Sequence, residues 1–342
     1  MKEIVVRSEK SYFVSFTDEI WKNIYKLTFE RKAVIVAPKS ILSIIGESLP
    51  SSVLVIEVEE GEAQKSISTF GKALEKMAAA KLDRTCLIVG IGGGATTDLT
   101  GFLAASYLRG VDWVAIPTSL AGMVDAAIGG KTGLNLEAGK NLIGAFHSPI
   151  EVLIDYRFLT TLPDRDLKAG MAEVAKCGFI EDTEILNLID DDWHENLNEL
   201  VYRSIAVKAK VVSSDFRETD LREILNYGHT LGHAVERHSK YSLRHGESVA
   251  LGLRFAAEAS YQFSGLSTHE RDRHDQVLDA LGLNSKYPKV CWPELLEIMR
   301  SDKKVRGGRI RLVTLSALGK PTRAENLCDE DLERCFLESI GE

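Results

Sequence analysis

Three of the eight histidines lie close together in the chain, at His229, His233 and His245. His229 and His233 are four residues apart, so on a helix both imidazoles would project from one face, as paired metal ligands do. Glu173 stands in an otherwise apolar, helix-like segment, where a carboxylate without a cation would be costly to bury. Two histidines and a glutamate, or three histidines, with one open position are the usual protein ligands of a catalytic zinc ion. The pattern predicts such a site, but spacing alone pairs His229 with His233 and does not identify the two ligating histidines.

A glycine turn with the sequence Gly-Ile-Gly-Gly-Gly-Ala occupies residues 90–95. It follows a strand-like run at 86–89 and precedes a helix-like stretch that begins at Thr96. Glycine lets the backbone approach a phosphate closely, and the free N–H groups of a helix N-terminus favour an anion. The turn predicts a dinucleotide site, although the string alone is a weak motif and is also compatible with a tight turn that needs glycine only for its geometry.

The string Gly129-Gly130-Lys131-Thr132 resembles part of a phosphate-binding P-loop. We reject that interpretation because Asp125 stands where the first glycine of the motif is required, and no strand leads directly into the string. The lysines and arginines near these motifs suit a substrate that carries phosphate and carboxylate groups. Taken singly, each is more typical of a solvated helix face.

The elements that must position these residues change in character along the chain. Strand-like runs at 33–37, 53–56, 86–89 and 113–116 alternate with helix-like segments such as 65–80, which predicts a parallel sheet with covered faces. Helical patterns then dominate at 166–180, 197–213, 224–240 and 245–263, and only 310–315 is strand-like. We therefore expect an N-terminal α/β nucleotide-binding domain at residues 1–160 and a mainly α-helical C-terminal domain at residues 161–342, which binds metal and substrate.

Composition excludes several other classes of protein. A net charge of −8 disfavours a nucleic-acid partner held by a general basic surface, and the five cysteines show neither paired nor Cys-x-x-Cys spacing. No apolar stretch approaches the length of a membrane-spanning helix, and no signal sequence is apparent at the start. We expect a cytoplasmic enzyme with a small-molecule substrate and no nucleic-acid or membrane partner.

The chain resembles the 3-dehydroquinate synthases, a family of sugar-phosphate cyclases. The resemblance runs in order from about residue 60 to residue 320. It rests on Gly92-Gly93-Gly94 with Asp98, Tyr107-Leu108-Arg109-Gly110, Pro117-Thr118-Ser119, residues 124–135 and 139–146, Ala172-Glu173-Val174 with Lys176, residues 215–218, Arg222, residues 225–236, His245-Gly246-Glu247 and residues 302–304.

This resemblance implies a homodimeric enzyme that uses NAD and a divalent metal, zinc or cobalt. The implied reaction converts 3-deoxy-D-arabino-heptulosonate 7-phosphate, a sugar-acid phosphate, to 3-dehydroquinate and phosphate in the shikimate pathway. A hydroxyl group is transiently oxidised, phosphate leaves by β-elimination, the carbonyl is reduced again, and ring opening and aldol closure follow.

The resemblance also assigns roles to individual residues. It implies that Glu173, His229 and His245 are the metal ligands, and that His233, Glu218 and Lys131 are catalytic. The expected substrate-binding residues are Arg109, Asp125, Lys131, Asn141, Lys176, Lys208, Arg222, Asn226, and one of Lys303 and Lys304. The expected cofactor-binding residues are Glu62, Lys65, Gly93, Gly94, Ala95, Asp98, Thr118, Ser119, Lys140 and Thr160.

Two other classes of protein, related enzymes and non-catalytic binding modules, are compatible with parts of the pattern. Another sugar-phosphate cyclase or a metal-dependent polyol dehydrogenase would share the architecture, but a polyol dehydrogenase would not need the anion-binding cations such as Lys131 and Arg222. A non-catalytic NAD- or metal-binding module would not need His233 and Glu218 in addition to the ligands. The departures from the family pattern, such as Thr96-Thr97 before Asp98, remove no charged or metal-binding residue.

Overall fold

The computed structural model describes the 342-residue chain except for residues 1, 30, 46–48, 51–52 and 305–309, and the side chains of 302–304 are also not described. Contacts divide the chain into two compact units. The first unit comprises Met1–Leu162 with Lys208–Arg217, and the second comprises Pro163–Val207 with Glu218–Glu342. The first unit therefore includes a late segment, Lys208–Arg217, that the expected division at residue 160 assigns to the second domain.

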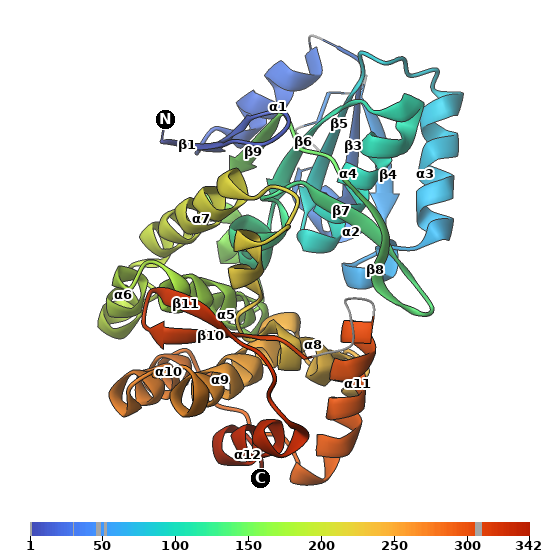
Figure 1. Cartoon of the computed structure of the whole chain (residues 1–342). Helices are drawn as coiled ribbons and strands as arrows, with labels where there is room; N and C mark the ends of the chain where they lie inside the picture. The colour runs from blue at the N-terminus through green and yellow to red at the C-terminus, as the bar shows by residue number, and fades with distance from the viewer. Residues whose placement is uncertain (1, 30, 46–48, 51–52, 305–309) are drawn as a thin grey trace. The chain divides into compact units, whose positions relative to one another are not determined.

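The first unit is built on a seven-stranded sheet (Figure 1). In spatial order its strands are β1 (Glu3–Val6), β2 (Tyr12–Phe16), β9 (Glu151–Ile154), β6 (Asp112–Pro117), β5 (Leu87–Gly92), β3 (Ala33–Pro38) and β4 (Leu54–Val58). Every neighbouring pair is parallel except β1 with β2. The chain passes from β3 to β4 on one side and then returns to β5 on the other side of β3, so the strand order reverses at β3 and β5.

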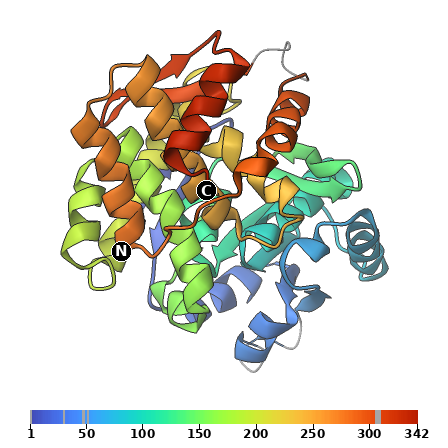
Figure 2. The same cartoon turned by 90° about the horizontal axis from the view of Figure 1, so that it is seen from below.

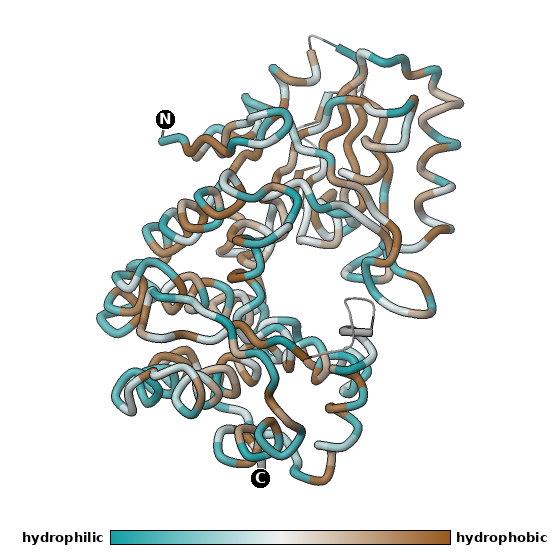
Figure 3. The backbone as a smooth tube through the Cα atoms, in the orientation of Figure 1, coloured by the Kyte–Doolittle hydropathy of each residue, from teal (hydrophilic) through white to brown (hydrophobic). Residues whose placement is uncertain are grey.

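The sequence explains why these strands occupy the centre of the unit. All residues of β3 and β5 are buried, as expected for parallel strands that are covered on both faces. Figure 3 shows this apolar character as brown tubes through the middle of the sheet. The four strands predicted from sequence correspond to β3, β4, β5 and β6, which confirms the α/β class of this part of the chain.

Helices and a separate hairpin complete the first unit. They are α1 (Ile20–Phe29), α2 (Lys39–Ile45), α3 (Ile67–Ala79), α4 (Gly94–Ser106), β7 (Lys131–Leu136) and β8 (Gly139–Phe146). Helix α4 packs closely on β5 because glycines of the strand leave room for threonines of the helix. A Cβ atom at Gly90 would lie 2.6 Å from Thr100 Oγ1, and one at Gly92 would collide with Thr96. Thr96 thus has a packing role in this chain.

The second unit is mainly helical, as predicted. Its elements are α5 (Asp164–Ile180), α6 (Glu184–Asp192), the first part of α7 (Leu197–Ser214), α8 (His229–His238), α9 (His245–Phe263), α10 (Thr268–Ala280), α11 (Trp292–Lys304), α12 (Asp329–Ser339), and the hairpin of β10 (Leu312–Ala317) and β11 (Lys320–Ala324). Helix α9 is the most buried of them and contacts α5, α8, α10, α12 and β10. Figures 1 and 2 show these helices in green through orange to red.

The single helix predicted at 224–240 is wrong. The structure has a 3-10 helix at Leu221–Asn226, a turn, and then α8. Tyr227 (φ −54°, ψ 122°) and Gly228 (φ 79°, ψ −18°) form a type II turn, whose second central position requires a positive φ. The turn makes His229 the first residue of α8. Within the described residues, no helix combines the length and apolar character needed to cross a membrane.

Candidate metal and dinucleotide sites

Three helices of the second unit bring one carboxylate and two imidazoles together. Glu173 on α5 is 1% exposed. His229 at the start of α8 and His245 at the start of α9 each place Nε2 at 3.3 Å from Glu173 Oε1. Neither oxygen of this buried carboxylate has a hydrogen bond of standard geometry, although Oε2 is ion-paired with Lys176 Nζ. Buried polar atoms normally have a hydrogen-bond partner, so these carboxylate oxygens are expected to bind a further partner.

The spacing of these atoms fits the coordination shell of a metal ion. Zinc binds histidine nitrogen and carboxylate oxygen at about 2.0–2.2 Å in a tetrahedron, so two ligand atoms lie about 3.3–3.5 Å apart. The two distances of 3.3 Å from Glu173 Oε1 match that ligand-to-ligand separation. The residues present therefore fit a divalent metal with three protein ligands.

The outer nitrogens of both imidazoles fix their orientation. His229 Nδ1 donates to the carbonyl oxygen of Tyr227 at 3.2 Å, and His245 Nδ1 donates to Glu236 Oε2 at 3.1 Å. In the neutral ring this leaves the lone pair on Nε2, the nitrogen that faces Glu173. Burial opposes a charge on His245, but the adjacent carboxylates of Glu173 and Glu236 outweigh burial and raise its pKa to about 10. The cluster thus favours positive charge at its centre.

His233, one turn along α8, is the third imidazole of the cluster. One ring nitrogen of each of His229, His233 and His245 lies within 4.8 Å of the other two. The His233 side chain is exposed, and the protein around the ring together with the nearby His229 and His245 lowers its pKa. His233 is therefore neutral near pH 7 and can accept a proton or ligate a metal.

Expected substrate residues of the second unit lie on α5, which carries Glu173, and in the 3-10 helix that precedes α8. Lys176 and Arg222 are each 2% exposed, and Lys176 pairs with Glu173. Asn226 Nδ2 donates to Glu218 Oε1 at 3.0 Å, and Glu218 has a positive φ of 57°. The side chains of Lys303 and Lys304 lie outside the described residues.

In the first unit, the glycine turn lies where a strand gives way to a helix. Gly93 directly precedes α4 and provides no side-chain cap for its N–H groups. Thr118 and Ser119 follow the neighbouring strand β6, and the Thr118 N–H donates to the Gly92 carbonyl at 2.9 Å. A Cβ atom at Gly93 would lie 3.3 Å from Ser119 Oγ. Free N–H groups at the carboxyl ends of parallel strands, next to a reversal of strand order, are typical of a nucleotide phosphate site.

A polar network in the same unit joins four of the predicted residues. Lys65 is 2% exposed, and its Nζ lies 2.6 Å from Asp98 Oδ2, 3.9 Å from Glu62 Oε2 and within hydrogen-bonding distance of Asn141 Oδ1. Asn135 links Glu62 and Asn141, because it donates to Glu62 Oε2 at 2.6 Å and accepts from the Asn141 N–H at 3.0 Å. Burial raises the pKa of Asp98 to about 6, and the nearby Lys65 opposes that rise.

The remaining predicted residues of the first unit are more dispersed. Lys208 Nζ forms an ion pair with the Asp125 carboxylate and donates to the Asp125 carbonyl at 2.6 Å. Arg109 is exposed and has a positive φ of 68°, and Lys131 is exposed at the start of β7. Ala95 lies in the first turn of α4 and Lys140 in β8, both half-buried. Thr160 is exposed after β9, where its hydroxyl donates to the Arg157 carbonyl at 2.8 Å.

Sequence reasoning did not assign roles to three residues that support these sites. Glu236 and the backbone of Tyr227 orient the two imidazoles, and Asn135 connects the lysine network. Glu236 gave a sequence signal, since it lies three residues after His233 on the same helix. The partners of Tyr227 and Asn135 are distant in sequence or are backbone atoms, so no spacing rule identifies them.

Comparison with known proteins agrees with this picture. A family model described as 3-dehydroquinate synthase N-terminal matches residues 55–169, and one described as 3-dehydroquinate synthase C-terminal matches residues 170–305. The chain is 49% identical to a 3-dehydroquinate synthase of Pseudarthrobacter chlorophenolicus over 282 residues, which cover 80% of this chain and 78% of the relative.

Two solved structures share the fold. One is a 2-deoxy-scyllo-inosose synthase complexed with carbaglucose-6-phosphate, NAD+ and Co2+, with a TM-score of 0.89 over 99% of this chain and all of that chain (100%). Its 23% identity shows the fold alone. The other is 2-epi-5-epi-valiolone synthase from Streptomyces hygroscopicus with NAD+ and Zn2+ bound, at a TM-score of 0.87 and 27% identity over 99% of this chain and 97% of that chain.

The two family models follow one another along the chain and together match well over half of it. The identity to the Pseudarthrobacter enzyme extends through most of both proteins. The chain therefore belongs to the 3-dehydroquinate synthase family.

Proposed function

We propose that this protein converts 3-deoxy-D-arabino-heptulosonate 7-phosphate to 3-dehydroquinate and inorganic phosphate, with NAD and a divalent metal, zinc or cobalt, as cofactors. The observation that carries the proposal is the convergence of His229 Nε2 and His245 Nε2 on Glu173 Oε1, at 3.3 Å each, in a chain of this family. By the same resemblance, the protein acts as a homodimer in the cytoplasm.

Glu173, His229 and His245 are the proposed metal ligands. Each Nε2 lies at the distance from Glu173 Oε1 that two ligands of a tetrahedral ion have, and hydrogen bonds at Nδ1 keep both Nε2 lone pairs directed toward that carboxylate. A metal bound there supplies Lewis acidity toward an oxygen of the substrate. His233 stays close enough to the cluster that its nitrogen is a competing ligand, so metal retention in variants must decide between the two assignments.

His233 and Glu218 are proposed to move protons. A neutral imidazole near pH 7 can accept a proton from a substrate hydroxyl, and the lowered pKa of His233 keeps the ring neutral. The side-chain amide of Asn226 donates to the Glu218 carboxylate, so a neutral group orients this carboxylate. Lys131, exposed at the start of β7, would place a positive charge against the phosphate that leaves.

The first unit is proposed to bind the dinucleotide. Gly93, Gly94 and Ala95 present backbone N–H groups at the start of α4, and Thr118 and Ser119 lie at the end of the adjacent strand. The network of Glu62, Lys65 and Asp98 offers carboxylates and a charge that suit ribose hydroxyls. Lys140 and Thr160 complete the proposed set. NAD held by these residues would supply a reversible hydride acceptor, and no net NADH would accumulate.

Positively charged and amide side chains are proposed to bind the anionic groups of the substrate. The proposed substrate-binding residues are Arg109, Asp125, Lys131, Asn141, Lys176, Lys208, Arg222, Asn226, and one of Lys303 and Lys304. Lys176, Lys208 and Arg222 support this role because their side chains are buried. A buried charge is costly without an anionic partner, which a phosphate or carboxylate of the substrate would supply. In the structure Lys176 and Lys208 are paired with Glu173 and Asp125, respectively.

The direct test is incubation of the zinc-loaded protein with the heptulosonate phosphate and NAD. We expect inorganic phosphate and 3-dehydroquinate to appear in equal amounts, with no net change in NADH absorbance. Phosphate release without dehydroquinate would favour another sugar-phosphate cyclase. Net NADH formation from a simple polyol, with the heptulosonate phosphate inert, would instead favour a polyol dehydrogenase.

A further inference from the structure

His274 is a fully buried histidine that the proposed reaction does not use. It lies on α10 with no exposed surface, and its ring stacks on Phe179 of α5 with centroids 3.8 Å apart. Its Nδ1 lies 2.8 Å from the Glu270 carbonyl oxygen, which can only accept, so Nδ1 carries the proton. Nε2 of the neutral ring is then an acceptor, and the Tyr227 hydroxyl donates to it at 2.9 Å.

Tyr227 connects this histidine to the metal cluster. Its side chain is fully buried and bonded to His274, while its backbone carbonyl accepts the Nδ1–H of His229 at 3.2 Å. The residue occupies the first central position of the type II turn that precedes α8. One residue thus contacts His274 through its side chain and a proposed metal ligand through its backbone carbonyl.

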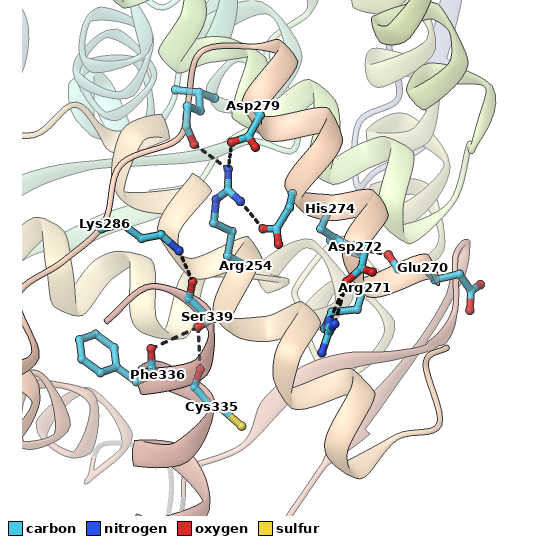
Figure 4. A network of polar contacts seen from close by, with 12 residues as sticks. Arg254, Glu270, Arg271, Asp272, His274, Asp279, Lys286, Cys335, Phe336 and Ser339 are labelled. Atoms are coloured by element: carbon cyan, nitrogen blue, oxygen red, sulfur yellow. Dashed lines mark hydrogen bonds and ion pairs between the residues drawn. The ribbon is translucent and has the colours of Figure 1, made fainter. Parts of the chain in front are cut away.

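Both sides of this arrangement are anchored. The buried Arg254 of α9 holds α10 in place (Figure 4). Its Nη2 lies 2.7 Å from Asp279 Oδ1 and 3.4 Å from the Leu283 carbonyl oxygen. The guanidinium also forms an ion pair with Asp275. On the other side, a Cβ atom at Gly252 of α9 would collide with the Gly228 carbonyl. The turn is thus pressed against α9, and His274 is presented by a helix fixed to that same α9.

We propose that His274 and Tyr227 are positioning residues for the metal ligand His229. The Tyr227 hydroxyl, held by His274 Nε2, fixes the turn so that its carbonyl orients the His229 ring with Nε2 toward Glu173. This inference rests on the proposed metal site. Loss of an outer hydrogen-bonding partner of a metal-bound histidine typically weakens metal binding by about 10- to 100-fold.

Tyr227→Phe is the variant that tests the proposal, because it removes one hydroxyl and keeps the ring. We expect cobalt affinity, measured by titration of the metal-free protein, to fall about 10-fold, and the visible absorption bands of bound Co2+ to change in position or intensity. The matched control is Tyr287→Phe. Tyr287 also bonds a histidine of the same unit through its hydroxyl, His238 Nδ1 at 2.7 Å, but its carbonyl accepts from the Glu342 N–H and from no proposed ligand. The control should bind cobalt as the parent protein does.

A second variant separates positioning from stability. In Tyr227→Phe with His274→Phe, both polar partners are replaced by apolar rings, which restores much of the stability lost in the single variant. Cobalt affinity should stay reduced, because the anchor of the turn is still missing. Parent-like affinity and an unchanged Co2+ spectrum in both Tyr227 variants would overturn the positioning role and leave the proposed function standing. A parent protein that binds no cobalt, or binds it equally well after His245→Ala, would overturn the metal site and the positioning role together.

Discussion

The two proposed cofactor sites are built in different ways. The metal cluster of the second unit consists of side chains from α5, α8 and α9, held by further side chains behind them. The dinucleotide site of the first unit relies on backbone N–H groups at Gly93 and Gly94, and on the absence of side chains there. A site made of side chains is sensitive to truncation, whereas one made of backbone is sensitive to added atoms.

The largest effect should follow truncation of a metal ligand. We expect His245→Ala to abolish both activity and metal retention, because an open site with three protein ligands binds weakly after it loses one. Metal content after dialysis and phosphate release measure the two losses. NAD binding, measured by calorimetry, should remain at the parent level, since the dinucleotide contacts belong to the other unit.

Truncation of the neighbouring imidazole should separate chemistry from metal binding. His233→Ala is expected to keep its metal but to lower kcat by about 10²-fold or more, as typical for loss of an acid–base group. If this variant and His245→Ala lose metal to the same extent, His233 is a ligand and the proposed ligand set is wrong.

The buried His274, which is proposed to help position the metal cluster, predicts a pH dependence of stability. Burial lowers the pKa of His274 from its usual 6.5 to about 4, so between these values the unfolded chain binds a proton that the folded protein does not. The contribution of the neutral His274 to the free energy of unfolding is complete above pH 6.5. It is lost as the pH falls toward 4, by up to about 3 kcal/mol. Guanidinium unfolding at pH 7.5 and pH 4.5 measures the loss, and His274→Phe should make it smaller. An equal loss in this variant would show that other groups cause it.

A single added methyl group tests the backbone-built site. In Gly94→Ala, the new Cβ would lie 2.9 Å from Ala126 Cβ, at the start of α4. We expect NAD binding to weaken about tenfold, equivalent to about 1.4 kcal/mol, with metal content unchanged. Gly71→Ala, on α3, is the control, because an added Cβ atom there would meet no other atom within 4 Å. Parent-like NAD affinity in Gly94→Ala would mean that the turn needs glycine only for packing.

The sequence predicted the elements whose apolar patterns are regular. Strands β3 and β5 are uninterrupted apolar runs, and α9 begins at His245 as expected. The helix predicted at 224–240 failed because Gly228 adopts a left-handed conformation that apolar periodicity does not encode. The β7–β8 hairpin was missed because its small and glycine-rich strands lack a clear alternation.

The candidate site was predictable by residue type but not by contact. The buried carboxylate of Glu173 and the paired histidines of α8 stand out in sequence, because their chemistry is unusual for a helix. The link from Lys65 to Asn141 joins residues far apart in the chain, and the Tyr227 carbonyl is a backbone atom that exists at every position. Such contacts depend on tertiary packing, which one sequence does not specify.

Anomalous diffraction from a crystal of the zinc-loaded protein tests the central claim most directly. We predict one strong zinc peak in the second unit, about 2.0–2.2 Å from Glu173 Oε1, His229 Nε2 and His245 Nε2, with the His233 ring outside bonding distance. A peak bonded to all three histidines and not to Glu173, or no peak among these residues, would contradict the account.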